Sequence, residues 1–384
     1  MQAVSTGHRD MVLAVDFNYF GTRMVSAGAD HRLEVCDKKD DTWVPVDRWK
    51  AHDAEVTDVK WNGPFMGDVL ASIGEDGHCK LWQEDCTEVI MSGNRFKLIA
   101  NIKSMTHTPF MSVDFKFINN ETWLALITRD GFLTVWEPTD PNSLNEWTSI
   151  AELWVCGDNG PGPQHEVGFK AVFHKEKLPC WKAIQAGLDR KSLGLAVAAM
   201  NDVFVFRTDK NKKFFRVAVL KGARDVIRDV AWANGSMRGS DLIATASKDG
   251  AIRIYELSTL QSDKSSTGSN ASPSVALPAA HAGSSQPGRS GKNTPSGIGA
   301  GLAGASKSAN YLPQDHELKP GQIRQEAKLV DELTQHHGAV WRVAFSQMGD
   351  LLVSTGDDGI VRSWKRDKDG HWLEYAEVGG GSRE

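Results

Sequence analysis

HHGAVWRVAFSQMGDLLVSTGDDGIVRSWK, residues 336–365, contains the features that decide the fold of this 384-residue chain. Its spaced apolar residues are Val340, Val343 and Phe345. An Asp-Gly turn follows at Asp358, and Trp364 stands six positions after that aspartate. Asp-Gly supplies the positive φ angles of a tight hairpin turn, and alternating apolar residues indicate half-buried strands. The stretch therefore predicts antiparallel strands joined by a tight turn.

The turn and its following aromatic residue recur along the chain. An acidic residue opens each turn, and an aromatic or similar residue stands six positions later. The pairs are Asp30 with Cys36, Asp76 with Trp82, Asp130 with Trp136, Asp249 with Tyr255, and Asp358 with Trp364. A sixth, degenerate copy has Asn201 in the turn and Phe206 one residue early. Where no long insertion intervenes, the copies recur at about the length of a four-stranded propeller blade, ~40–45 residues plus short insertions.

A second pattern precedes each turn, with apolar residues at one position, three later and five later. Its copies are Val12/Val15/Phe17, Val56/Val59/Trp61, Phe110/Val113/Phe115, Phe169/Val172/His174, Ile227/Val230/Trp232 and Val340/Val343/Phe345. Histidines precede four copies, at His8, His52, His107 and His337. This rhythm resembles the WD repeat. It predicts an all-β, WD-repeat β-propeller of six four-stranded blades, in which the turn acids and the residues Trp82, Trp136 and Trp364 are structural.

Composition divides the chain into three parts. Residues 261–312 are dominated by Ser, Gly, Ala and Pro and contain one aromatic residue, Tyr311. Such a segment cannot bury enough apolar surface to offset the entropy of ordering it, so we expect it to be disordered. We expect residues 1–260 to hold blades 1 to 4 and part of blade 5. Residues 313–384 then supply the rest of blade 5 and blade 6.

Charge and cysteine content exclude several classes of function. The net charge of −5 and pI near 6.2 give no electrostatic footprint for direct nucleic-acid binding. A basic group, Lys210, Lys212, Lys213 and Arg216, is interpreted as a solvated turn. The sequence contains no run of 18 apolar residues, so it predicts no membrane-inserted segment. The five cysteines form no CxxC pair. We therefore expect an intracellular, soluble protein with reduced thiols and no zinc site.

Catalytic motifs are missing from the sequence. It contains no nucleophile elbow, P-loop, Rossmann glycine pattern or HExxH. The recurring His and Asp residues resemble acid–base pairs, but recurrence in nearly every blade favours a structural role. We expect no enzymatic activity and no catalytic, cofactor or metal site.

The ends of the chain bear on ring closure. Only Met1 to Thr6 precede His8, which is too short for a strand donated to the last blade. HWLEYAEV, residues 371–378, can serve as the outer strand of blade 6 itself. A closed ring with a weak junction and an open ring filled by another protein are both compatible with this pattern.

Three stretches resemble one WD-repeat family in particular: residues 17–37, 135–150 and 336–365. They are similar to the Seh-type nucleoporin of the Y-shaped, outer-ring complex of the nuclear pore. The resemblance covers residues 1–260 and 313–384. It implies an open six-bladed propeller, close kin to the WD-repeat subunit of the COPII outer coat. An α-solenoid nucleoporin would insert a blade between the first and last blades.

The resemblance also implies a location, a role and partners. The protein would be a scaffold at the nuclear envelope, within the nuclear pore complex, supporting pore assembly and the transport of protein and mRNA. It would also join the TOR-regulating, amino-acid-sensing complex at the vacuole or lysosome surface. Alternatives are a COPII-type coat subunit and a closed-ring adaptor that binds peptides. By position, the resemblance assigns as lining of the gap the residues Val12, Leu13, Val15, Phe17, Val340, Trp341, Val343 and Phe345.

Overall fold

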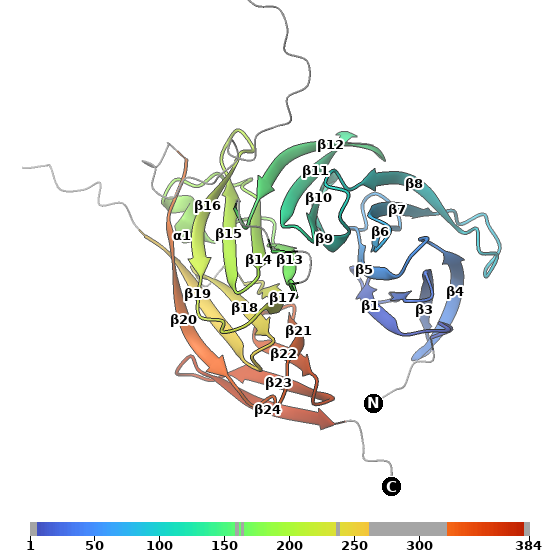
Figure 1. Ribbon diagram of the computed structural model, residues 1–384. Coiled ribbons are helices and arrows are strands. Elements are labelled where there is room, and N and C mark those ends of the chain that lie inside the picture. The colour runs from blue at the N-terminus through green and yellow to red at the C-terminus, as the bar shows by residue number, and fades with distance from the viewer. Residues whose placement is uncertain (1–5, 158–160, 163–164, 236–238, 261–320, 380–384) are drawn as a thin grey trace, which may run out of the picture. The chain divides into compact units, whose positions relative to one another are not determined.

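The computed structural model describes residues 6–157, 161–162, 165–235, 239–260 and 321–379. Consecutive strands form six antiparallel four-stranded sheets, which are the blades of a β-propeller (Figure 1). The fold is therefore the predicted six-bladed propeller. The 261–312 insertion, predicted to be disordered, lies outside the described residues.

Each blade is built from four strands that follow one another in the chain. Blade 1 is β1 (Val12–Phe17), β2 (Arg23–Gly28), β3 (Arg32–Lys39) and β4 (Thr42–Lys50). Blade 2 is β5 (Val56–Trp61), β6 (Val69–Gly74), β7 (His78–Glu84) and β8 (Phe96–Lys103). Blade 3 is β9 (Phe110–Ile118), β10 (Glu121–Thr128), β11 (Phe132–Asp140) and β12 (Ser143–Trp154).

The second half of the ring has the same organisation. Blade 4 is β13 (Phe169–Phe173), β14 (Gly194–Ala199), β15 (Asp202–Thr208) and β16 (Phe214–Leu220), with the short helix α1 (Trp181–Gln185) after β13. Blade 5 is β17 (Ile227–Trp232), β18 (Asp241–Ser247), β19 (Ile252–Thr259) and β20 (Gln325–Leu333). Blade 6 is β21 (Val340–Phe345), β22 (Leu351–Gly356), β23 (Ile360–Arg366) and β24 (Trp372–Gly379).

The apolar pattern, in which the second residue stands three positions and the third five positions after the first, has a structural cause. A register shift lies near the start of the innermost strand of blades 1, 2, 3, 5 and 6, for example between Val56 and Asp58. The extra residue of such a bulge changes the alternation, so Val56 and Val59 share one face. β13 has no bulge, and Phe169, Ala171 and Phe173 pack against blade 3 instead. Val172 and His174, three and five positions after Phe169, therefore lie on the other face of β13.

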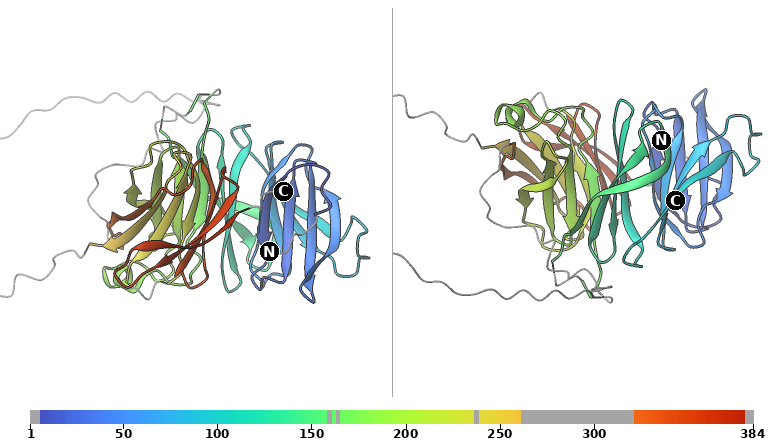
Figure 2. Two further views of the ribbon diagram at one scale, coloured as in Figure 1. Left: turned by 90° about the horizontal axis from the view of Figure 1, so that it is seen from below. Right: turned by 90° about the horizontal axis from the view of Figure 1, so that it is seen from above.

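The core consists of five hydrophobic clusters, each shared by two consecutive blades. They join blades 1 and 2, 2 and 3, 3 and 4, 4 and 5, and 5 and 6. Within the described part of the chain, no such cluster joins blade 6 to blade 1. In Figures 1 and 2 the blue sheet of blade 1 and the red sheet of blade 6 share no strand. The described strands thus leave this sixth junction without a shared core.

Candidate functional site: the seam between blades 1 and 6

Equivalent positions in different blades show where apolar surface is left uncovered. Val15 and Phe17 of β1 are 44% and 50% exposed, whereas Val59 and Trp61 at the same positions of β5 are buried. These two residues would face a preceding blade, as Val59 and Trp61 face blade 1. We define the blade-1 seam face as Val15, Phe17, Met24 and Trp43, and the Phe17 and Trp43 rings lie 5.6 Å apart.

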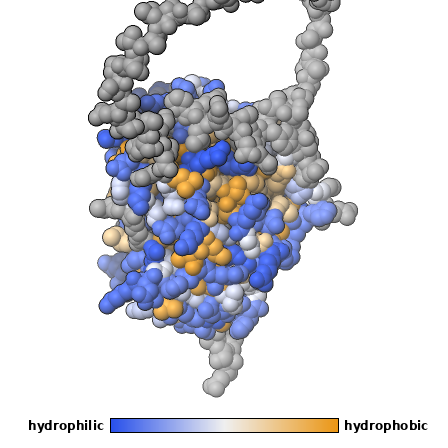
Figure 3. All heavy atoms as spheres, turned by 90° about the vertical axis from the view of Figure 1, so that its left-hand side faces the viewer, coloured by the Kyte–Doolittle hydropathy of each residue, from blue (hydrophilic) through white to orange (hydrophobic). Residues whose placement is uncertain are grey.

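Blade 6 leaves its opposite face uncovered. Val353 of β22 is 39% exposed, and its equivalent in blade 2, Ala71, is fully buried against blade 3. Leu373 and Val378 of β24 lie on the same face, and both are exposed. We define the blade-6 seam face as Ala344, Val353, Leu373 and Val378, and the seam as the space between the two faces. On the left-hand side of Figure 1, by contrast, the surface is mostly hydrophilic with separate apolar patches (Figure 3).

The eight gap-lining residues predicted from position lie in different environments. Val12 and Leu13 are half-buried and line the central cavity, while Val15 and Phe17 lie on the blade-1 seam face. The predicted residues of β21 instead belong largely to the junction with blade 5. Val340 and Val343 are buried in the cluster that joins blades 5 and 6, and Phe345 packs against it.

Trp341 is exposed but turns toward blade 5. Its indole N–H donates a hydrogen bond to Asp357, and the Arg228 guanidinium lies 4.5 Å from its ring centroid. The apolar seam residues of β22 and β24 were not among the predicted ones. Strand alternation is the signal for them, because Val353 directly follows the buried Leu352 and therefore points to the opposite face of β22.

The inner end of the seam opens into a cavity of about 560 Å³ on the propeller axis, lined by both β1 and β21. Six charged side chains of this cavity form three ion pairs. Asp16 contacts Lys60 at 3.2 Å, Asp58 contacts Lys170 at 2.7 Å, and Asp114 contacts Lys175 at 2.6 Å. Burial alone would raise the pKa of Asp58, but the neighbouring lysines lower it to about 2. These contacts are those of structural ion pairs.

The turn aspartates form hydrogen-bond networks in three blades. Asp76 accepts from the ring of His52, while Ser72 contacts the other ring nitrogen and accepts from the Trp82 indole N–H. Asp30 with His8 and Ser26, and Asp358 with His336, Ser354 and Trp364, repeat this arrangement. The predicted histidine of blade 6, His337, is therefore wrong by one residue.

The other two turn aspartates use different partners. Asp130 accepts from the hydroxyls of Thr106 and Thr108, which flank the predicted His107. The Trp136 indole N–H donates to Thr134 at 2.9 Å. Asp249 accepts from the Arg253 guanidinium at 2.8 Å. All of these contacts connect parts of a single blade.

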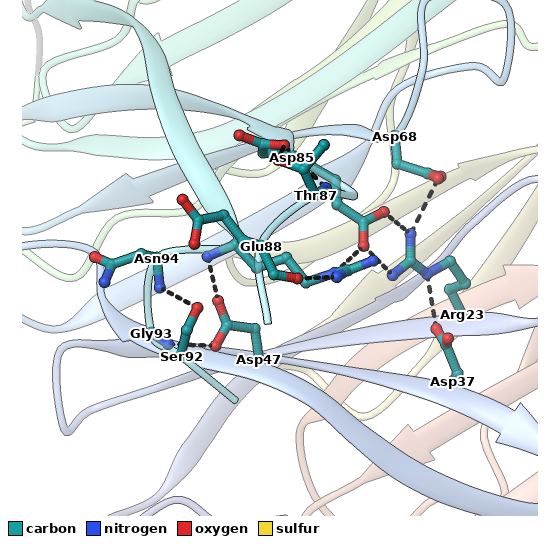
Figure 4. Close-up of polar contacts among 12 residues, drawn as sticks. Arg23, Asp37, Asp47, Asp68, Asp85, Thr87, Glu88, Ser92, Gly93 and Asn94 are labelled. Atoms are coloured by element: carbon teal, nitrogen blue, oxygen red, sulfur yellow. Dashed lines mark hydrogen bonds and ion pairs between the residues drawn. The ribbon is translucent and has the colours of Figure 1, made fainter. Parts of the chain in front are cut away.

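Blade 1 is fastened to blade 2 by polar contacts at the outer rim (Figure 4). Asp47 of β4 accepts from the backbone N–H groups of Gly93 and Arg95, at 2.7 and 2.8 Å. Glu84 at the end of β7 bridges Arg95 and Arg23 of β2, with its carboxylate 2.5 Å from each guanidinium. These contacts hold blade 1 from one side, and its seam face lies on the other.

Among the described residues, no group of three or more His, Cys, Asp and Glu side chains could hold a metal ion. No helix in the described ranges is both long and apolar enough to cross a bilayer. The five cysteines carry free thiols.

Comparison with known proteins finds WD repeats and similarity to nucleoporins. The sequence model "WD domain, G-beta repeat" matches residues 1–37, 43–83, 214–256 and 327–365. Nucleoporin SEH1 of Saccharomyces cerevisiae is 29% identical over 371 residues, covering 95% of each chain. Nucleoporin seh1 of Schizosaccharomyces pombe is 27% identical over 94% of this chain and 91% of its own. The human nucleoporin SEH1 is 24% identical over 97% and 86%. The chain therefore contains WD repeats and is similar, over nearly its full length, to the nucleoporins named SEH1.

Proposed function

We propose that this chain is a non-catalytic scaffold subunit of the nuclear pore complex whose seam receives a β-blade from a partner protein. Homology to the SEH1 nucleoporins supports the place in the pore. The single observation that carries the mode of binding is the count of inter-blade cores, five for six blades in the described ranges. A binding scaffold needs a surface that fits a particular partner, and the two seam faces form such a surface.

The chemistry of the seam specifies that occupant. Both faces present apolar side chains from twisted β-sheets, at positions that are buried at the other junctions. A four- or three-stranded sheet with two apolar faces is the shape that fits between them, because sheets pack face to face at about 10 Å. Such an interface is expected to be large and apolar, like a domain core divided in two. The partner therefore contributes a sheet, and the propeller contributes the two neighbouring layers.

The resemblance to the Seh-type family suggests the source of this sheet. In that family an α-solenoid nucleoporin of the Y-shaped complex donates the inserted blade. We propose the same partner here, in the outer ring of the pore, where the complex supports pore assembly and the transport of protein and mRNA. On the same resemblance we propose a second assembly with subunits of the TOR-regulating complex at the vacuole or lysosome surface.

Hydrogen exchange tests the seam directly. The chain is compared alone and in complex with the co-purified α-solenoid nucleoporin. Protection is expected to rise in β1, and in β22 and β24 of blade 6, because an inserted blade excludes water from both seam faces. The strands β14 and β18, which are already covered on both faces, serve as the internal control. If protection rises on the outer strands of blades 3 to 5 while β1 and blade 6 stay unchanged, the inserted-blade proposal is wrong.

Co-purification separates the assemblies. Tagged chain from native extract is expected to bring down solenoid nucleoporins as its main stoichiometric partners. Recovery of COPII coat subunits in their place would support the coat function. Recovery of a ubiquitin-ligase adaptor would support the closed-ring peptide receptor.

A further inference from the structure

We propose that a basic recess between blades 3 and 4, away from the seam, binds an acidic peptide segment that carries an apolar side chain. The recess has a volume of about 500 Å³. It is bounded by the β9–β10 turn, the segments before and after α1, and the β15–β16 turn. Sites that bind small molecules have volumes of about 300–1,000 Å³, so this recess can enclose one side chain and its neighbouring groups.

Cationic side chains from three separate segments meet around this recess. They are Lys177, Arg190, Lys191, Lys210 and Lys212. In the described ranges only Lys212 forms an ion pair, with Glu137 at 2.7 Å. Two of these lysines belong to the basic group seen in the sequence, and folding adds the other three cations to them. The turn of β15 and β16 is thus one wall of a larger basic surface.

The carboxylates of the recess have other roles. Asp189 accepts the backbone N–H of Lys191 at 2.7 Å, and Asp209 accepts those of Asn211 and Lys213 at 2.8 and 3.0 Å. These bonds fix the two turns that present the lysines. With Glu121, the lining holds three acids against five cations, so its formal charge is +2 (5 − 3). The recess is positive although the whole chain carries −5.

Apolar side chains form the floor of the recess. Ile118, Trp123 and Leu193 line it, and Leu178 is exposed at its edge. Trp123 is buried. The floor therefore suits one apolar side chain, and the rim suits flanking carboxylates or phosphates.

The same features favour a peptide over other polyanions. Nucleic acid and anionic membranes are bound by extended basic surfaces. This basic surface is confined to one recess on an acidic protein. A concave apolar floor also does not contribute to the affinity for a phosphate backbone. An acidic segment with a single apolar anchor uses both the floor and the rim.

Fluorescence anisotropy with defined probes tests this site on the full chain. The probes are a labelled glutamate-rich peptide with one central phenylalanine, the same peptide without phenylalanine, and a lysine-rich counterpart. The first is expected to bind saturably at 0.15 M salt, the second more weakly, and the third not at all. Equal binding of the first and third peptides, or no saturable binding, would overturn the proposal. Tighter binding of labelled oligothymidine or anionic vesicles would overturn the choice of ligand.

Two matched double variants localise the binding. K191E/K210E reverses two rim charges and is expected to lower the affinity for the phenylalanine peptide at least ten-fold. K328E/K368E makes the same change in net charge on blades 5 and 6, and is expected to leave binding within two-fold. Equal losses would mean that only net charge matters. Leu178→Ser should remove the advantage of the phenylalanine peptide over its glutamate-only form. All four lysines and Leu178 are exposed, so unchanged thermal melting verifies folding.

Discussion

Val15 and Val59 hold the same position on the inner strands of neighbouring blades, yet Val15 is 44% exposed and Val59 is completely buried. Val59 packs into the cluster shared with blade 1, whereas nothing in the described chain covers Val15 from the other side. The repeat therefore places identical side chains in unlike environments, depending only on whether a blade precedes them.

Truncating each of these valines measures this difference. Val59→Ala is expected to lower the free energy of unfolding by about 1.5–3 kcal/mol, from lost apolar burial and a residual cavity. Val15→Ala removes surface that is already half-exposed and should cost less than half as much. Urea denaturation of the isolated chain supplies both values. Equal losses would show that Val15 is buried in the free protein.

A charge on the blade-6 seam face should affect binding more than folding. Val353→Glu is expected to weaken the partner complex at least ten-fold, because an inserted sheet would bury an unpaired carboxylate. Val89→Glu, at an exposed valine on the β7–β8 loop, is the matched control and should bind normally. Titration by calorimetry provides the comparison. Normal affinity of the Val353 variant would place the partner elsewhere.

Removing a turn aspartate should destabilise a blade. Asp76→Ala leaves the His52 ring and the N–H groups of Asp53 and His78 without their acceptor. The expected loss is about 1–3 kcal/mol, the usual cost of an unsatisfied buried polar group. Asp53→Ala, at an exposed residue, is the control and should change thermal melting little. Stoichiometric zinc in the purified protein would contradict the structural role of these residues.

Buried histidines should make the fold sensitive to mild acid. Burial, reinforced by Arg207 and Lys116, lowers the pKa of His174 well below its ordinary value, and burial also lowers the pKa of His52. Below about pH 6.5, the unfolded chain binds protons that these folded imidazoles do not bind, so stability falls as the pH drops. At higher pH this contribution is constant.

His174→Phe isolates one of these two imidazoles. It keeps an aromatic ring beside Trp232, whose centroid lies 5.0 Å from that of His174. The variant should lose less stability than the wild type between pH 7 and 5 in urea titrations. Identical pH profiles would show that His174 does not contribute.

Deleting residues 261–312 should leave the propeller intact, because their composition cannot form a core. Thr259 and Gln325 are paired directly across β19 and β20, so a short connection can join these strands. Thermal melting of the deletion variant is expected within a few degrees of the full chain. A larger decrease would mean that the segment packs on the propeller.

The sequence by itself determined the number of blades and the arrangement of their strands. Turn signals such as Asp76-Gly77 and the apolar alternation that follows act over a few residues, and six copies specify six sheets. The bulge in β5 that sets Val56 and Val59 on one face is also local. In blade 4 the same spacing has a different outcome, because β13 has no bulge and Val172 does not share the face of Phe169.

Only the tertiary structure decided which equivalent residues are covered. Val343 repeats the position of Val15 and reads the same in sequence, but it is buried against blade 5. Val353 reads as one more residue of a buried strand, yet it lies on an open face. Likewise, Lys177, Arg190 and Lys210 become one basic surface only when three segments meet. Burial and electrostatic fields depend on neighbours that are distant in sequence, and a local pattern contains no information about which neighbour is absent.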